Sequence, residues 1–352
     1  MSTYNPDLAV GKLRVLPART KTNVAAERRF PLVPFNQLVV GRSSAYLVKG
    51  LIPRVGIAVV WGPPKCGKSF WTFDLAIHSA LGWDYRGRRV VSGTVVYCAF
   101  EGAEGFKARA TAFRQQHNIN PHAPVPFYLV RLRLDLVKDH RGLIASIQEQ
   151  IGDTKPVSVT LDTLNRSLAG SESSDEDMTA YLNAADAIRE AFGCVVIIVH
   201  HCGVDGTRPR GHTSVTGTAD VQLAVKRDAA DNVLVTVEHM KDGPEGDMIA
   251  SRLERVDLGS DEDGDPITSC IIVPVETSET KAAEGPRLTK NQQTMFSILH
   301  DAECLTKEQW NERARDAGLG TSRKADLHDL RTALLHKQLV YETTSGFRVK
   351  QP

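Results

Sequence analysis

The chain has 352 residues and a nearly balanced charge, with 43 Lys and Arg against 42 Asp and Glu and a formal net charge of +1. That length suggests two domains, or one large domain with an appendage. Hydrophobic residues make up 41% and charged residues 24%, which excludes global disorder. The near-neutral balance excludes a uniformly basic nucleic-acid coat, although a local basic surface stays open.

The apolar runs and the cysteines point to a cytoplasmic protein. No apolar run approaches ~18 residues, so no transmembrane helix is expected. The N-terminus lacks the apolar stretch of a secretory signal. The six cysteines are scattered without a CxxC pair, which disfavours a disulfide framework and fits a reducing compartment.

The N-terminal residues differ in composition from the rest. Residues 1–30 are rich in Lys and Arg and are predicted to form a flexible basic arm, although a frayed terminus fits them equally well. The apolar stretch FPLVPFNQLVV (30–40) is expected to pack on the core or on a neighbouring subunit.

From residue 57 onward the pattern predicts an α/β domain, which we place at 31–275. Apolar, β-branched runs without alternation are typical of strands buried on both faces; they lie at 57–61, 94–100, 157–161 and 195–199. Helix-period segments lie between them, at 69–80, 103–117, 140–151 and 177–192. This alternation predicts a mainly parallel sheet with right-handed crossovers. Four further strands are expected to extend the sheet in antiparallel fashion, at 221–227, 232–240, 248–256 and 267–275.

The C-terminal part reads as a separate small domain. Residues 276–286 are predicted to be a linker, and residues 287–352 to form the second domain. Three helices and a two-stranded wing are expected there, at 290–300, 306–317, 323–337 and 339–349. This pattern predicts a winged-helix-like domain, which can serve either DNA binding or protein contacts.

The strongest signal is a glycine-rich loop between the strand at 57–61 and the helix after it. The residues that satisfy the pattern G-x-x-x-x-G-K-S/T are Gly62, Pro63, Pro64, Lys65, Cys66, Gly67, Lys68 and Ser69. In this context, backbone N–H groups and the positive end of the helix dipole converge on phosphates. Lys68 is expected to bridge the β- and γ-phosphates and the Ser69 hydroxyl to bind Mg²⁺; the nucleotide-binding stretch extends to Phe70. The flanking strand and helix disfavour the alternative, a glycine turn without a ligand.

Phosphoryl transfer also needs a second metal-holding carboxylate and a group that orients water. Asp162 follows the strand at 157–161, so its carboxylate is expected at the carboxyl edge of the sheet, beside the glycine-rich loop. Glu101 follows the strand at 94–100 and is a candidate to activate the attacking water. The structural alternatives are an aspartate that caps the next turn and a glutamate that stabilises the following helix through its dipole.

A third strand ends in the polar residues His200, His201 and Cys202. A side chain at that position can touch the γ-phosphate or its water and report hydrolysis to the following loop. A zinc site made of these residues and His212 is disfavoured, because adjacent strand residues point to opposite faces and the spacing fits no common zinc pattern.

Taken in order, these features resemble the RecA-like ATPases. More closely, they resemble the hexameric replicative helicases of plasmid RepA type and their phage and prophage relatives. The stretches that carry the resemblance lie within 31–256 and read VVWGPPKCGKSFW, VVYCAFEGAEG, VTLDTLNRSLAGSESSDEDM, VVIIVHH and RGHTSVTGTADV. The resemblance implies a RecA-like P-loop fold, an ATPase activity, and ATP and Mg²⁺ as cofactors.

The resemblance also assigns roles to residues of one subunit's site. Glu101 falls at the position of the catalytic base. Asp162 falls at the position of the metal-holding aspartate. Either His200 or His201 falls at the position of the residue that senses the nucleotide.

Two further residues match positions that act on a neighbouring subunit. Arg210 falls at the arginine finger that reaches the neighbour's nucleotide. Lys241, within HMKDGPEG (239–246), matches a loop that sends basic residues to the adjacent site in bacterial replicative helicases, although those enzymes often have Arg there. A site completed by a neighbour requires a ring or filament, so the resemblance implies a homo-oligomer, in this family a hexameric ring.

The resemblance implies single-stranded DNA as a partner, with replication proteins as further partners. RecA-like motors contact DNA through loops that correspond to 165–177 and 201–215 here. The first loop is acidic and reads as a solvated loop. The second carries Arg208 and Arg210 among glycines, which suit either DNA phosphates or a finger. Neither loop has an aromatic residue for base stacking.

The leading hypothesis is an ATP-hydrolysing motor on single-stranded DNA that resembles a replicative helicase. One alternative is a recombination or repair ATPase, or a helicase loader, with the same chemistry. A second is a nucleotide-switched DNA-binding regulator. A small-molecule kinase is disfavoured, because the two carboxylates and the histidine pair fit a site that activates water.

Overall fold

The computed structural model describes most of the chain, namely residues 32–38, 45–203, 206–276, 288–302, 304–320, 325–337, 339–343 and 345–350. The predicted basic arm and the predicted linker after Glu276 lie outside these residues. Within 32–38, η1 (Phe35–Gln37) is one turn of 3₁₀ helix, and the side chains of Leu32, Phe35 and Leu38 are exposed. None of the described helices has the length and apolar character needed to cross a bilayer.

A large sheet organises the described residues from 45 to 276, and its strand order is β11-β10-β9-β8-β3-β7-β6-β4-β5. The six strands from β8 to the edge strand β5 in this order run parallel. They are β3 (Gly56–Gly62), β4 (Val95–Ala99), β5 (Phe127–Val130), β6 (Ser158–Asp162), β7 (Val195–His201) and β8 (Val221–Arg227). The α/β fold with a mainly parallel central sheet is therefore confirmed. Each of the four apolar runs predicted as parallel strands contributes one of these strands.

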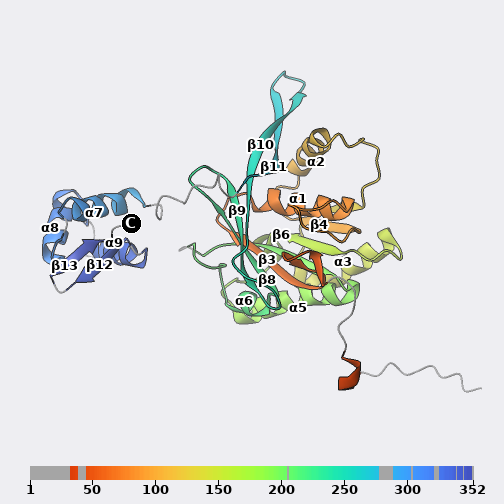
Figure 1. Cartoon of the computed structure of the whole chain (residues 1–352), viewed down its shortest axis with the longest axis horizontal. Coiled ribbons are helices and arrows are strands. Elements are labelled where there is room, and N and C mark those ends of the chain that lie inside the picture. Colours follow the sequence, from red (N-terminus) through yellow and green to blue (C-terminus); the bar gives the residue numbers. More distant parts are fainter. Residues whose placement is uncertain are drawn as a thin grey trace, which may run out of the picture. The chain divides into compact units, whose positions relative to one another are not determined.

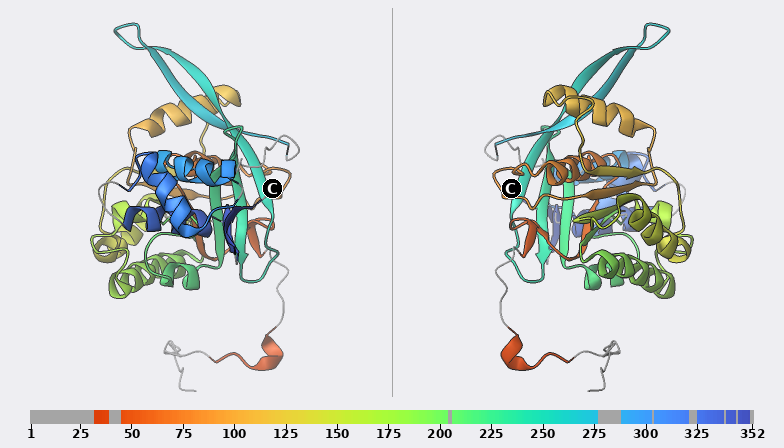
Figure 2. Two further views of the ribbon diagram at one scale, coloured as in Figure 1. Left: turned by 90° about the vertical axis from the view of Figure 1, so that its left-hand side faces the viewer. Right: turned by 90° about the vertical axis from the view of Figure 1, so that its right-hand side faces the viewer.

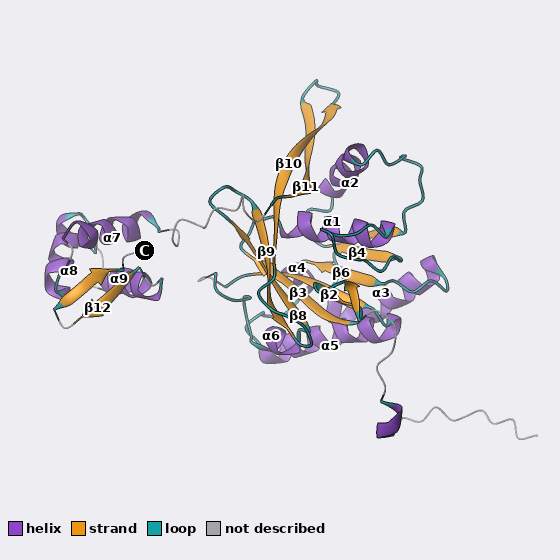
Figure 3. Cartoon of the chain, in the orientation of Figure 1, coloured by secondary structure: helices purple, strands orange, loops and turns teal. Residues whose placement is uncertain are grey.

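Helices cover the two faces of this sheet (Figures 1 and 3). On one side lie α1 (Lys68–Leu81) and α2 (Gly105–Gln116), and on the other lie α3 (Leu136–Ile151) and α5 (Asp175–Phe192). Successive residues of β3 alternate between the two cores: Ile57 and Val59 pack with the α3–α5 layer, and Ala58 packs with the α1 layer. Burial on both faces explains the apolar sequences of β3 (GIAVVWG) and β4 (VVYCA).

The expected antiparallel extension is present, with one difference. The strand at 221–227, β8, pairs parallel with β3 and antiparallel with β9 (Val233–Met240), so the change of direction falls one strand later. The sheet then continues through β10 (Met248–Ser260) and β11 (Pro266–Pro274). These two form a long hairpin that extends beyond the body of the sheet (Figure 2) and contacts α2. The turn between them is acidic and carries Asp261, Glu262, Asp263 and Asp265.

Several short elements are not predicted from the sequence, because they are too short to show a hydrophobic periodicity. They are the two-stranded ribbon β1 (Tyr46–Val48) and β2 (Ile52–Pro53), the parallel edge strand β5, and the short helices α4 (Leu164–Ser167) and α6 (Ser214–Thr218). The helix α4 follows the end of β6, where the first loop predicted to face DNA begins, and α6 starts where the second such loop, at 201–215, ends.

The described C-terminal residues form three helices and a hairpin around a core of their own. The elements are α7 (Lys290–Ala302), α8 (Lys307–Asp316), α9 (Ala325–His336), β12 (Val340–Thr343) and β13 (Gly346–Val349). Trp310 anchors this core, since it is fully buried and its Nε1 donates a 2.8 Å hydrogen bond to the carbonyl of Met295. Thr306 and Gln309 form a capping box at the start of α8.

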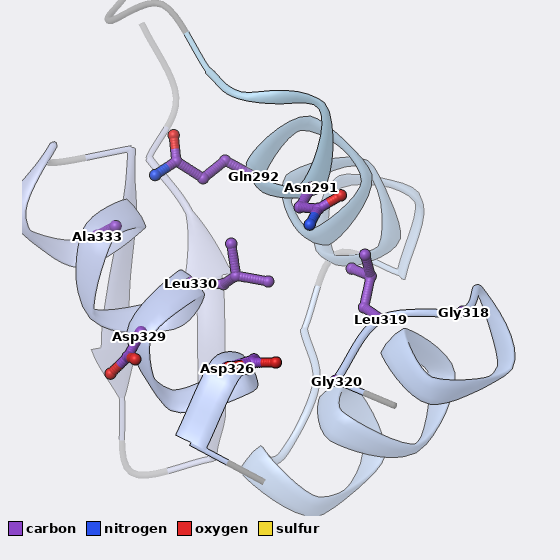
Figure 4. Close-up of a pocket in the computed structure, with 9 residues that line it drawn as sticks. All are labelled: Asn291, Gln292, Gly318, Leu319, Gly320, Asp326, Asp329, Leu330 and Ala333. Atoms are coloured by element: carbon purple, nitrogen blue, oxygen red, sulfur yellow. The ribbon is translucent and has the colours of Figure 1, made fainter. Parts of the chain in front are cut away.

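A groove of about 550 Å³ lies between α7, the end of α8 and α9 in this part of the chain (Figure 4). Asp326 and Asp329 line it, together with Asn291 and Gln292 from the start of α7. Arg331 of α9 is buried, and its Nη1 donates a 2.9 Å hydrogen bond to Oδ1 of Asn311. The described part of α9 therefore presents acids and histidines rather than exposed Lys or Arg.

Candidate nucleotide-binding site

The glycine-rich loop leaves β3 at Gly62 and enters α1 at Lys68, as predicted. Gly67 caps the helix with a φ of 103°, and a Cβ there would lie 2.9 Å from Cγ2 of Val233. A Cβ on Gly62 would lie 2.1 Å from the carbonyl oxygen of Val225. Both glycines are therefore required by the fold, and they leave the start of α1 with its free N–H groups at the loop. Pro64 and Lys65 are exposed at the loop tip.

The side chain of Lys68 folds back over the loop. It is 5% exposed, and its ammonium donates hydrogen bonds to the carbonyls of Gly62 (2.9 Å) and Pro63 (2.7 Å). The Sγ of Cys66 lies 3.9 Å from the same nitrogen. Burial raises the pKa of the Cys66 thiol, while the charge of Lys68 lowers it. Lys68 is thus a buried cation inside a loop shaped for an anion.

Asp162 ends β6 and is fully buried. The Tyr97 hydroxyl, from neighbouring β4, donates a 2.7 Å hydrogen bond to Oδ2 of Asp162. The hydroxyl of Thr72 lies 2.8 Å from that of Tyr97 and 3.0 Å from the carbonyl oxygen of Lys68. A short chain of polar groups therefore connects the buried aspartate to the first turn of α1.

The electrostatics of Asp162 fit a cation. Burial raises the pKa of its carboxyl, while hydrogen bonds from Tyr97 and from the Ser69 hydroxyl lower it. Its Oδ1 is buried and has no hydrogen-bond partner among the described residues, a costly state for a carboxylate unless a cation is bound. An aspartate oxygen and a serine hydroxyl beside a phosphate loop are ligands that Mg²⁺ takes. The residues present therefore fit Mg²⁺, held by Ser69, Asp162 and the nucleotide phosphates.

Glu101 lies just beyond the end of β4 and is about half exposed to solvent, at 47% for its side chain. The hydroxyl of Thr163 donates to its Oε2 (3.4 Å), and Nε of Arg166 lies 3.9 Å from the same oxygen. Glu101 raises the pKa of both Asp162 and His201 through its charge, so the three groups lie near one another. The carboxylate is thus open to water beside the buried aspartate.

The two histidines at the end of β7 face different surroundings. His200 is fully buried, and its Nε2 donates a 2.7 Å hydrogen bond to the carbonyl of Arg210. His201 is half-buried, is in register with Gly62 of β3, and is under the charges of Lys68 and Glu101. Burial lowers the pKa of both rings, and the charge of Lys68 lowers that of His201 further. His201 is therefore the histidine on the phosphate side.

The sequence model of the AAA domain family matches residues 26–207, just over half of the chain. The chain belongs to the AAA domain family. The matched stretch contains the phosphate loop, both carboxylates and the histidine pair, whereas Arg210 and Lys241 lie beyond it.

Solved structures similar to this AAA protein include a RadB recombinase and a KaiC-like protein from the hyperthermophilic archaeon Pyrococcus horikoshii OT3. The first shares 17% identity with a TM-score of 0.42, over 56% of this chain and 87% of that chain. The second shares 12% identity with a TM-score of 0.44, over 65% of this chain and 94% of that chain. No curated protein matches the chain.

Arg210 of this AAA protein is held by a residue that the sequence did not single out. Its Nε lies 2.9 Å from Oε2 of Glu172, which is buried and accepts a 2.8 Å hydrogen bond from Asn165 at Oε1. His212 similarly pairs with Asp175 at 3.2 Å. Asp175 and Glu176 of the loop at 165–177 are exposed, in line with the predicted solvated acidic loop, whereas Glu172 of the same loop is buried and pairs with Arg210 of the loop at 201–215. Because the contact joins two loops, the sequence of neither loop alone predicts it.

Lys241 lies at the opposite edge of the sheet. It follows the end of β9, and its Nζ is 3.6 Å from Oδ1 of Asp220, whose Oδ2 accepts a hydrogen bond from the backbone N–H of Ile57 at the start of β3. Lys68 and Glu101 lie beyond the carboxyl ends of the strands. Lys241 is therefore remote from the phosphate loop of its own chain.

Proposed function

We propose that this protein is an oligomeric ATPase that couples hydrolysis to movement on single-stranded DNA, as a replicative helicase does. The observation that supports it most is the placement of Lys68, Glu101 and His201 within electrostatic range of one another, beside a buried Asp162. These are the groups that bind, activate water and sense the γ-phosphate in such motors. The AAA domain family supports the ATPase; the DNA motor is the proposal.

The residues divide the chemistry of hydrolysis among them. The loop N–H groups and Lys68 bind the phosphates, and Ser69 and Asp162 hold Mg²⁺, which neutralises phosphate charge when bound. Glu101, open to solvent, takes a proton from the attacking water. His201, neutral because burial lowers its pKa, offers a hydrogen bond to the terminal phosphate or to the water. Hydrolysis would break that contact. The change would be transmitted to the loop at 201–215, because this loop begins at the end of β7, where His201 lies.

The proposal includes an oligomer because two basic residues that are predicted to act on a nucleotide have no role at the nucleotide site of their own chain. Arg210 is 60% exposed even though it pairs with Glu172, and Lys241 is 69% exposed at the far edge of the sheet. Either one can reach a neighbour's nucleotide in a ring, which would complete the site at the subunit boundary. We assign this work to residues 31–275 and treat the C-terminal winged-helix-like domain as an accessory to it.

The DNA-binding surface proposed here is small. Arg208 is exposed on the loop at 201–215, while Arg210 and His212 of that loop are paired with acids. Such a small surface fits a motor that binds DNA only as an oligomer. In a ring, each subunit would contribute one exposed arginine around a single DNA strand. A recombination-type ATPase or a helicase loader would use the same nucleotide site. A nucleotide-switched DNA-binding regulator would need that site only to bind the nucleotide.

Three measurements on the full chain test the proposal. Oligomeric mass with and without MgATP is expected to show a larger assembly with nucleotide. The ATPase rate is expected to rise with added single-stranded DNA, and a forked DNA is expected to be unwound. A strict monomer that hydrolyses ATP would overturn the trans roles of Arg210 and Lys241. DNA-stimulated hydrolysis without unwinding would favour the recombination-type ATPase or loader, and an ATPase rate indifferent to DNA would favour the regulator.

A further inference from the structure

The loop that follows the edge strand β5 presents three consecutive side chains to solvent. Arg131, Leu132 and Arg133 are all exposed, and Leu132 is 76% accessible. The residues on either side, Val130 and Leu134, pack against the core on the α3–α5 side of the sheet. The loop is therefore held at both ends, with a leucine between two arginines directed outward.

The acids next to this loop do not neutralise its arginines. Among the described residues, neither Arg131 nor Arg133 lies within ion-pair distance of a carboxylate. Asp135 pairs instead with Lys138 at 2.9 Å. Asp139 accepts a 2.9 Å hydrogen bond from the backbone N–H of Asp135 at the start of α3, where the helix dipole favours a negative charge. The exposed part of the loop is therefore positively charged.

The same loop adjoins one of the two loops that are predicted to face DNA. Nε of Arg133 donates a 3.2 Å hydrogen bond to the carbonyl of Arg166 in α4, at the start of the loop at 165–177. Both arginines line a hollow of about 310 Å³. The side chain of Arg166 is 48% exposed, and its nearest acid, Glu101, lies 3.9 Å away. The two loops therefore present their cations side by side.

The strand order places this surface on a continuous rim. The strands β7, β6, β4 and β5 are consecutive in the sheet and parallel, so the loops after their carboxyl ends are neighbours. Parallel strands lie about 4.8 Å apart, so the three intervals from β7 to β5 span about 14 Å. A nucleic-acid strand advances about 3.4 Å per stacked nucleotide, so this rim has room for about four nucleotides.

We infer that Arg131, Leu132 and Arg133 form a further contact for single-stranded DNA, at the edge strand of the sheet. This inference rests on the proposed DNA motor, and it extends the DNA-binding surface from Arg208 along the rim. The guanidinium forks bind backbone phosphates, and the leucine covers the apolar face of a base. Because phosphate contacts carry no sequence information, the contact is expected to tolerate any base sequence.

Binding of a labelled oligo(dT) to the full chain, with Mg²⁺ and a non-hydrolysable ATP analogue present, tests this inference. Each phosphate contact on a single strand contributes about 0.7 to the slope of log K against log salt, so Arg131→Ala with Arg133→Ala is expected to lower that slope by about 1.4. The corresponding loss of affinity is about 25-fold at ~0.1 M salt. Each single alanine variant is expected to show about half of the change in slope, so the test does not depend on the folding of one variant.

Two further variants separate this contact from a general effect of charge. Leu132→Ser is expected to weaken binding about threefold, because an apolar contact is lost, and to leave the salt slope unchanged. Arg89→Ala with Lys155→Ala removes two exposed cations that precede β4 and β6, and it is expected to keep both affinity and slope. An equal loss in this control would contradict the contact.

The remaining outcomes distinguish this inference from the proposed function. A wild type that binds no oligo(dT) would overturn the DNA motor and this contact with it. A wild type that binds, while Arg131→Ala with Arg133→Ala matches it in affinity and slope, would overturn the contact alone. The contact is also wrong if the alanine variants lose DNA binding because they no longer assemble with MgATP, since the arginines would then serve a neighbouring subunit. The oligomeric mass of each variant decides this last case.

Discussion

The hydroxyl of Tyr97 donates a 2.7 Å hydrogen bond to Oδ2 of Asp162, and both side chains are fully buried. This relationship joins neighbouring parallel strands, because Tyr97 lies in β4 and Asp162 ends β6. It leaves Oδ1 as the oxygen free for a metal ion. It also opposes the effect of burial, which would otherwise favour the protonated acid and weaken metal binding.

Tyr97→Phe is expected to weaken Mg²⁺ binding at the site without abolishing it. The lost hydrogen bond is worth about 1 kcal/mol, so we expect the Mg²⁺ concentration for half-maximal ATPase activity to rise about fivefold. The pKa of Asp162 is expected to rise further, because a hydrogen bond to its charged form is lost, and the acid limb of the pH–rate profile is expected to move to higher pH. Tyr128→Phe, which changes an exposed tyrosine on β5, is the matched control. An unchanged Mg²⁺ titration in Tyr97→Phe would contradict the role given to this hydrogen bond.

Arg210→Ala is expected to keep nucleotide binding and to lose most turnover. If Arg210 acts as a finger on the neighbour, the rate is expected to fall on the order of 10³-fold. The substitution also breaks the ion pair with Glu172, so Glu172→Gln is the control: it removes the same pair but leaves the guanidinium available. Steady-state ATPase rates and nucleotide affinities of both variants separate the two effects. Equal losses in both variants would show that the pair, rather than the finger, matters.

The parts of the site that sequence predicts share one property. Gly62, Glu101, Asp162 and the histidine pair each follow an apolar run, and the ends of parallel strands meet at one edge. Their position in the chain therefore determines their position in space. Tyr97 and Glu172 break this relation. Tyr97 reads as one more core residue of β4, and Glu172 reads as one acid of a solvated loop, because what each of them binds is set by tertiary packing.

The same limit applies to the choice between the histidines. Which of His200 and His201 faces the phosphates depends on the register of β7 against β3, and a shift of one residue would exchange them.

Asp74→Asn is expected to change how stability depends on pH. Burial raises the pKa of Asp74 to about 6 from 3.8, although Arg86 lies 3.0 Å away. Between those values the native state binds more protons than the unfolded state, so the contribution of Asp74 to the free energy of unfolding falls as pH rises from about 4 to about 6.

The size of this effect is on the order of 3 kcal/mol, at 1.36 kcal/mol per pKa unit. Burial lowers the pKa of His78 and His117, an effect of the opposite sign, and the charge of Asp74 partly offsets it at His117. The difference in urea denaturation between the two proteins therefore reports Asp74 together with its effect on His117. Relative to wild type, Asp74→Asn is expected to gain stability as pH rises through this window. Asp84→Asn, an exposed site in the same region, is expected to show no such trend, and a flat difference for Asp74→Asn would refute the argument.

Replacing each histidine of the pair in turn is expected to give two different defects. His201→Asn removes the ring that faces Lys68 and Glu101, so we expect a fall in the rate of hydrolysis and in its stimulation by DNA, with a thermal midpoint close to that of the wild type. His200→Asn removes a buried 2.7 Å hydrogen bond to the carbonyl of Arg210. An unpaired buried carbonyl costs about 1–3 kcal/mol, so here we expect a lower thermal midpoint and faster proteolysis within 201–215. Melting curves, limited proteolysis and ATPase rates on the two variants decide the matter, and a pattern in which His200→Asn is stable but inactive would exchange the two roles.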